Sequence, residues 1–166
     1  ALPICIATSS HIILPWSGLI MPSKPVSYNV FIILYISIEP SDDKCAASSK
    51  SLGGGSVMDA AKNMAMFIPQ PSDNLWDYAN SPSGGKMTPP NEMLPWIAIT
   101  TSAGTGSEVD TIGVISNPDT NEKIGIGGMA GMFAKYAIVD PELMKTVPPK
   151  FTAYQGFDAR FHSLEG

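Results

Sequence analysis

Three short clusters in this sequence carry residue types that could do chemistry. The first is the run of glycines at 53–55, followed by Ser56, directly ahead of a helical pattern. Glycines let backbone N–H groups approach an anion closely, and the first turn of a helix offers further unpaired donors at the same place. The run is therefore either a cradle for a pyrophosphate group or a tight strand-to-helix turn. In both cases Ser56 and Asp59 are spaced as a capping box.

The second cluster is rich in hydroxyl groups. Residues 101–108, TSAGTGSE, directly follow an apolar run that is typical of a buried strand. Loops in this position bind ligands in open α/β sheets, although such a loop can also be a flexible connector. Two loops of this kind in one short domain favour a phosphate-bearing ligand. Lys123 lies in a predicted hairpin just beyond and could add a cation or a ribose contact, although a lysine there is more often merely solvated.

The third cluster contains Asp158 and His162. Residues four apart on a helix lie about 40° from each other, so these two side chains share one face. One helix can deliver two ligands to a divalent metal in this way, and the alternative is a hydrogen bond between the two side chains. Arg160 points to the opposite side. The other histidine, His11, is distant in sequence, so the chain cannot complete a typical site from histidines by itself.

The elements that must position these clusters follow an α/β pattern. Apolar residues recur at helical spacing from Ser56 to Ile68, which predicts a helix, and a second helix is expected over residues 151–164. The segment 74–90 has no period and is expected to be a surface loop that closes over something. Strands are predicted at 4–8, 30–38, 96–100, 111–116, 123–126 and 136–139, with the fourth and fifth forming a hairpin.

Composition narrows the class of protein. The 166 residues, 44% of them hydrophobic, suit roughly one domain, and a net charge of −5 without a basic stripe argues against nucleic acid as a partner. Prolines at 3, 15, 22 and 25 break the longest uncharged stretches well short of the roughly 20 continuous apolar residues that span a bilayer, so no membrane association is expected. Cys5 and Cys45 form no disulfide framework, and the N-terminus lacks the basic region of a signal peptide. The expected setting is reducing and cytoplasmic.

From Ser51 to Gly166 the chain resembles the iron-containing (group III) alcohol dehydrogenases. Four motifs of that family occur here in order. They are GGGSVMDAAK at 53–62, TSAGTGSE at 101–108, VDPEL at 139–143 and GFDARFHSLE at 156–165. Arg160 replaces an apolar residue that is usual in the last motif. The first fifty residues do not match the opening of the family.

The resemblance implies a nicotinamide cofactor, NAD or NADP. In the family the glycine loop holds the pyrophosphate, the threonine loop contacts the cofactor, and a lysine near the hairpin and a residue after the VDP segment contribute as well. These roles fall on Gly54, Gly55, Ser56, Asp59, Thr101, Ser102, Thr105, Lys123 and Leu143.

The resemblance also implies a metal, Fe2+ or alternatively Zn2+, with Asp158 and His162 as two of its four ligands. In the family a C-terminal all-helical domain supplies the other two, both histidines. Residues 1–148 are thus expected to form a Rossmann-like dinucleotide-binding domain with a parallel sheet and a β-hairpin. Residues 149–166 would be the first helix of the helical domain, which is otherwise missing from this chain.

The implied function is an NAD(P)-dependent oxidoreductase that interconverts a primary or small alcohol and its aldehyde or ketone. The metal would act as a Lewis acid on the alcohol oxygen while hydride passes to the nicotinamide. A homo-oligomer is expected for the whole protein, and these 166 residues alone are expected to be inactive. Two alternatives stay open: a nucleotide-binding module without catalysis, and a glycerol-type polyol dehydrogenase of the same architecture.

Overall fold

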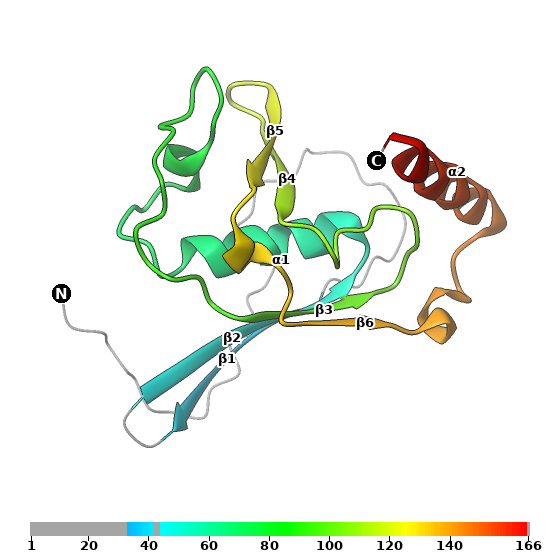
Figure 1. Cartoon of the computed structure of the whole chain (residues 1–166), viewed down its shortest axis with the longest axis horizontal. Helices are drawn as coiled ribbons and strands as arrows, with labels where there is room; N and C mark the ends of the chain where they lie inside the picture. The colour runs from blue at the N-terminus through cyan, green and yellow to red at the C-terminus, as the bar shows by residue number, and fades with distance from the viewer. Residues whose placement is uncertain (1–32, 42–43, 166) are drawn as a thin grey trace.

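The computed structural model describes residues 33–41 and 44–165, which form an α/β fold (Figure 1). The predicted strand at 4–8 lies outside the described residues. The strands are β1 (Ile33–Ser41), β2 (Lys44–Gly53), β3 (Trp96–Thr100), β4 (Ile112–Asn117), β5 (Glu122–Gly127) and β6 (Tyr136–Val139). The helices are α1 (Gly55–Phe67) and α2 (Pro149–Glu165), with 3-10 turns η2 (Leu75–Tyr78), η3 (Ala130–Met132) and η4 (Pro141–Met144).

Four strands form the main sheet in the order β1-β2-β3-β6. The β2-β3 and β3-β6 pairs are parallel, as expected for strands connected by crossovers, whereas β1 pairs antiparallel with β2 at the edge. Strand β2 was not predicted, because its sequence is rich in small and polar residues rather than apolar ones. Its Ser49 and Ser51 are nevertheless fully buried, and the Ser51 hydroxyl donates to the carbonyl of Ile97 on β3 at 3.4 Å.

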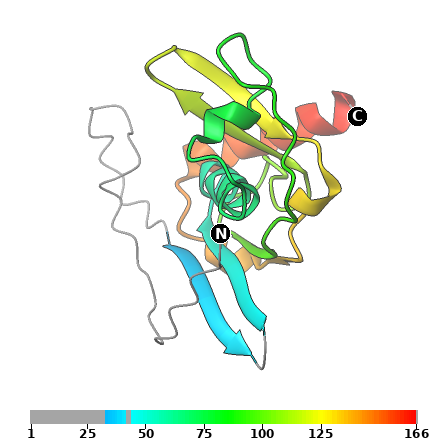
Figure 2. The same ribbon diagram turned by 90° about the vertical axis from the view of Figure 1, so that its left-hand side faces the viewer.

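Helix α1 lies between the main sheet and the β4-β5 hairpin, so the molecule has three layers (Figures 1 and 2). The helix is rich in alanine and methionine, which are strong helix formers, and it ends just before Pro69. Strand β3 alternates, with Trp96, Ala98 and Thr100 buried. The cluster between helix and sheet consists of Met58, Ala61, Ala65, Trp96 and Ala98.

The segment 74–90 is only partly the surface loop that its sequence predicts. Tyr78 and Ala79 are buried and pack with Met66, Ile126 and Met132 in a second core cluster beside the hairpin. Aromatic side chains bury a large area without needing a helical or strand period, which is why pattern analysis missed this contribution.

Ser83 ties the same segment to the hairpin. Its hydroxyl accepts from the Trp76 indole at 2.8 Å and donates to the carboxylate of Glu122 on β5. That donation is the main reason why the pKa of Glu122 lies below its usual value.

Helix α2 confirms the prediction of a helix over 151–164, and its residues lie mostly exposed. The hairpin and the strand at 136–139 are confirmed as well. Among the residues that the structure describes, no helix is both long and apolar enough to cross a membrane.

Trp96 provides a test of the packing between helix and sheet. It is 1% exposed, and its indole N–H donates to the carbonyl of Met132 at 2.9 Å. Trp96→Phe should lower the free energy of unfolding by about 1–3 kcal/mol, because it leaves that carbonyl buried without a partner. Trp76→Phe is the control and should cost less, since Ser83 stays open to water. Urea denaturation measures both; equal losses would contradict this account of the core.

Candidate functional site

Three strands of the main sheet end at one edge. In the register of the sheet Gly53 pairs with Thr100, and Thr100 pairs with Val139. The segments that follow these residues therefore leave the sheet side by side: the glycine turn (53–55), the threonine loop (101–107) and η4. This is the edge of a parallel sheet at which ligands bind in open α/β folds.

The glycine turn packs directly against the threonine loop. A Cβ atom on Gly54 would lie 2.9 Å from the Ser102 hydroxyl, and one on Gly55 would lie 2.7 Å from Thr105 Cγ2. Both distances are shorter than real Cβ contacts, so a side chain at either glycine would force Ser102 or Thr105 to move. The Thr101 N–H also donates to the carbonyl of Gly53 at 3.0 Å. The structure thus brings together the two clusters that the sequence singled out separately.

Helix α1 presents an uncapped N-terminus at this place. Gly54 is the N-cap and no side chain caps the helix, so the predicted capping box of Ser56 and Asp59 is wrong. The first backbone bonds run from Val57 and Met58 to the carbonyl of Gly54, at 3.0 and 3.1 Å. Gly55 and Ser56 lie between the N-cap and Val57, and their backbone N–H groups are the donors that a helix leaves for an anion. Ser56 is also exposed.

A buried lysine that sequence reasoning missed holds the far end of the threonine loop. Lys62 on α1 is 0% exposed, and its ammonium donates to the Ser107 hydroxyl at 3.2 Å, to the carbonyl of Ile112 at 3.1 Å and to the carboxylate of Asp110. It also lies 5.7 Å from the ring centroid of Trp96. All three ammonium protons have acceptors, so the charge is compensated without water.

Asp59 completes this network one turn earlier on α1. Its carboxylate accepts from the Ser107 hydroxyl at 2.6 Å and from the N–H of Val114 on β4 at 3.1 Å. The side chain therefore contacts the loop and the hairpin rather than the helix N-terminus. The sequence held a signal for this arrangement, because Asp59 and Lys62 are the two charged residues of a helix that is rich in alanine and methionine.

Helix α2 contacts the middle of the threonine loop. The Ala103 N–H donates to the Gln155 side-chain oxygen at 3.1 Å. Gly104 has a φ of +103°, and a Cβ there would lie 2.8 Å from the Gln155 carbonyl oxygen and 3.0 Å from Asp158 Oδ2. Asp158 is therefore next to the loop that also contacts the glycine turn.

Asp158 and His162 lie on one face of α2, as predicted, with His162 Nε2 3.6 Å from Asp158 Oδ1. Two donor atoms bound to one tetrahedral ion at about 2.0–2.2 Å would lie about 3.4 Å apart, so the pair fits a shared metal. Both side chains are about half exposed, at 48% and 60%. Within the described part of the chain, no group of three or more His, Cys, Asp or Glu side chains could hold a metal.

Two predicted cofactor residues lie apart from the contact between the glycine turn and the threonine loop. Leu143 is in η4, which follows β6 at the same edge of the sheet, and the residue is 37% exposed. Lys123 is exposed on β5, where it pairs with Ser116 in the hairpin layer. The structure thus places Leu143 near the strand ends and Lys123 on the other side of α1 from the main sheet.

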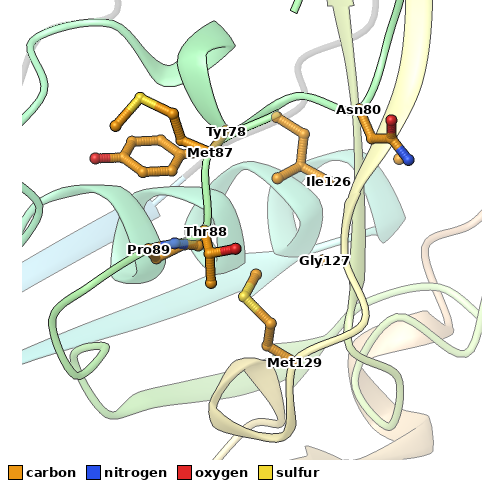
Figure 3. A pocket seen from close by; sticks show the side chains of 9 residues that line it. Tyr78, Asn80, Met87, Thr88, Pro89, Ile126, Gly127 and Met129 are labelled. Atoms are coloured by element: carbon orange, nitrogen blue, oxygen red, sulfur yellow. The ribbon is translucent and has the colours of Figure 1, made fainter. Parts of the chain in front are cut away.

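A pocket of about 330 Å³ lies elsewhere, between the segment 78–89 and the end of β5 (Figure 3). The Met129 side chain points toward Thr88 across it. None of the predicted site residues lines this pocket. The lining residues are Tyr78, Asn80, Met87, Thr88, Pro89, Gly125, Ile126, Gly127 and Met129.

Comparison with known proteins bears directly on this site. The family model described as iron-containing alcohol dehydrogenase matches residues 51–141, a range that contains the glycine turn and the threonine loop. A mitochondrial hydroxyacid-oxoacid transhydrogenase of Caenorhabditis briggsae is 36% identical over 153 residues, covering 86% of this chain and 33% of the relative. That match extends into the first fifty residues.

A nicotinamide cofactor is named in the descriptions of two further similar proteins. NADH-dependent butanol dehydrogenase A of Clostridium acetobutylicum is 40% identical over 115 residues, or 69% of this chain and 28% of the relative. The crystal structure of sulfoacetaldehyde reductase from Bifidobacterium kashiwanohense in complex with NAD+ matches with a TM-score of 0.59 and 41% identity. It covers 66% of this chain and 27% of that one. The chain thus spans about a third or less of the length of these relatives.

The network around Lys62 provides a test of how the loop is held. Lys62→Met should lower the free energy of unfolding by at least about 1.5–3 kcal/mol, the worth of a hydrogen bond to a charged group. Lys145→Met is the matched control: it breaks an exposed ion pair with Glu142 and should cost about 0–1 kcal/mol. Chemical denaturation of both variants gives the comparison. A Lys62 variant no less stable than the control would show that the network does not hold the loop.

Proposed function

This chain belongs to the iron-containing alcohol dehydrogenase family, and on that premise we propose that it forms the nicotinamide-binding side of an alcohol dehydrogenase active site. The observation that carries the proposal is the contact between the glycine turn and the threonine loop beside the uncapped end of α1. Residues 1–148 are proposed as the dinucleotide-binding domain and residues 149–166 as the start of the metal-binding helical domain. A homo-oligomeric assembly and a cytoplasmic location stay predictions.

The proposed cofactor is NAD, with NADP as the alternative. Gly54, Gly55 and Ser56 would hold the pyrophosphate, because their backbone N–H groups lie at the positive end of a helix that no side chain caps. Ser102 and Thr105 line the same place from the threonine loop, with Thr101 at its start. Asp59 acts on this site through Ser107, and Leu143 and Lys123 are proposed as outer contacts.

The proposed metal is iron, with zinc as the alternative, held by Asp158 and His162. Carboxylate and imidazole suit both ions, and the 3.6 Å between their donor atoms suits a shared ion. When bound, the metal would supply a Lewis acid for the oxygen of a primary or small alcohol, and the cofactor would take up or give the hydride. The described residues contribute binding and position: the glycine turn orients the dinucleotide, and Asp158 lies beside the loop that lines it.

A second candidate concerns the substrates. The match to the C. briggsae hydroxyacid-oxoacid transhydrogenase over 153 residues favours hydride transfer between a hydroxyacid and an oxoacid. We propose that the bound cofactor would carry the hydride from one to the other. Both candidates use the same cofactor residues. Incubating the metal-loaded intact protein with a deuterated hydroxyacid and an oxoacid, without added free cofactor, separates them. Label in the reduced oxoacid supports the transhydrogenase, whereas alcohol-dependent reduction of added NAD supports the dehydrogenase.

The proposed activity itself is tested with the full-length protein after reconstitution with metal. Reduction of NAD or NADP should depend on added alcohol and on the metal, and removal of the metal with a chelator should abolish turnover. If the protein binds cofactor but neither assay shows turnover, the remaining interpretation is a nucleotide-binding module without catalysis.

The glycine turn is tested by adding one methyl group. Gly55→Ala places a Cβ 2.7 Å from Thr105 Cγ2, so the Thr105 side chain must move away from the turn, and NAD affinity should fall about tenfold, equivalent to about 1.4 kcal/mol. The double variant Gly55→Ala with Thr105→Ser lacks the clashing methyl and should recover part of the affinity. Isothermal titration measures both.

Gly156→Ala is the matched control for this series. A Cβ at Gly156 meets nothing within 4 Å and lies in helix α2, so NAD affinity should stay unchanged. Equal affinity of the Gly55→Ala variant and the parent protein would remove the glycine turn from the cofactor site.

The metal ligands are tested by His162→Ala and Asp158→Asn in the intact protein. Metal content and turnover should both fall steeply, whereas NAD binding to the metal-free protein should persist because its contacts come from other loops. If the two side chains form only a helical ion pair, stability should fall by about 0.2–0.5 kcal/mol with full metal content. Metal analysis together with NAD titration decides between these readings.

A further inference from the structure

Gln155 is a residue for which the proposed function gives no role. Among the residues of α2 that the structure describes, it is the one that is partly buried. Its side-chain oxygen accepts a hydrogen bond from the N–H of Ala103 at 3.1 Å. The amide thus fixes the backbone of the threonine loop to a helix 52 residues further along the chain.

The next turn of the same helix carries the proposed metal ligand Asp158. Its carboxylate lies against Gly104, the residue after Ala103, where an added Cβ would be 3.0 Å from Oδ2. The φ of +103° at Gly104 and the nearby Gln155 carbonyl leave no room for a side chain. Two consecutive residues of the threonine loop therefore contact two residues of α2, three positions apart on one face.

The residues on either side of this contact touch the glycine turn. Ser102 lies against Gly54 and Thr105 lies against Gly55. The loop is thus placed between the proposed metal helix and the proposed pyrophosphate site, and it touches both. Figure 1 shows α2 on the same side of the molecule as the loop that follows β3.

We propose that Gln155 is a positioning residue that couples metal binding at Asp158 and His162 to dinucleotide binding at the glycine turn. This inference rests on the proposed function. Metal binding restrains α2, the Gln155 amide passes that restraint to Ala103, and the loop is held where Ser102 and Thr105 line the turn. The dinucleotide then binds a loop that is already ordered, so each ligand raises the affinity of the protein for the other.

The test measures the NAD dissociation constant of the intact protein by isothermal titration, with and without bound Zn2+. In the parent protein Zn2+ should tighten NAD binding by about fivefold or more. Gln155→Met keeps the length of the side chain but removes the acceptor. The ratio of the NAD dissociation constants without and with Zn2+ should then fall to near one. The NAD affinity of the metal-free protein and the Zn2+ affinity without NAD should change little. Gln155→Glu restores an acceptor oxygen and should restore the ratio.

Ser163→Ala is the control on the same helix. Its hydroxyl donates to the carbonyl of Ala159 at 2.8 Å, a bond within the helix, so its loss should leave the ratio at the parent value. A melting curve for each variant establishes that it is folded. The coupling distinguishes a positioning role from a structural one, because a change in helix stability alone would not alter the ratio selectively.

The failures are distinguishable. If the parent protein does not bind NAD under either condition, the proposed function is wrong and the coupling with it. If NAD binds equally well with and without Zn2+, or if Gln155→Met keeps the parent ratio, the coupling is wrong and the proposed function stands.

Discussion

The buried ammonium of Lys62 sets the constraint on which the arrangement of this molecule depends. A charge without solvent exposure is tolerated only where every proton meets an acceptor, because desolvating an unpaired charge costs several kcal/mol. Its acceptors are Ser107, Asp110 and Ile112, which lie 45 to 50 residues further along the chain. Helix α1 can therefore pack beside β3 only if the end of the threonine loop and the start of β4 pack against the helix as well.

That constraint shapes the proposed cofactor site from a distance. With Ser107 held between Lys62 and Asp59, the threonine loop has little freedom at its far end. Its near end is fixed by the pairing of Gly53 with Thr100 across the sheet. The stretch between these two anchors lies against the glycine turn and α2. The hydrogen bonds that compensate the buried charge of Lys62 thus determine the position of the hydroxyl groups in the threonine loop.

Much of this fold follows from sequence pattern, and the exceptions have physical causes. Helix α1 was predicted from its period, the hairpin from its turn residues and α2 from the prolines that introduce it, and all three signals are local. Strand β2 was missed because small polar side chains fill its buried positions, which a hydrophobic pattern does not register. The capping box failed because the helix begins at Gly55 with Gly54 as the N-cap, and the Asp59 carboxylate bonds to the loop and the hairpin instead. Contacts of such separation, including those of Lys62 and Gln155, are set by tertiary packing and leave no periodic signal.

We propose that the glycine turn and the threonine loop together hold the pyrophosphate of a nicotinamide cofactor. A crystal structure of the intact protein with NAD tests it most directly. Phosphate oxygens are expected within hydrogen-bond distance of the backbone N–H groups of Gly55 and Ser56, with Thr105 beside them. A dinucleotide bound elsewhere, for example in the pocket between Tyr78 and Met129, would contradict it.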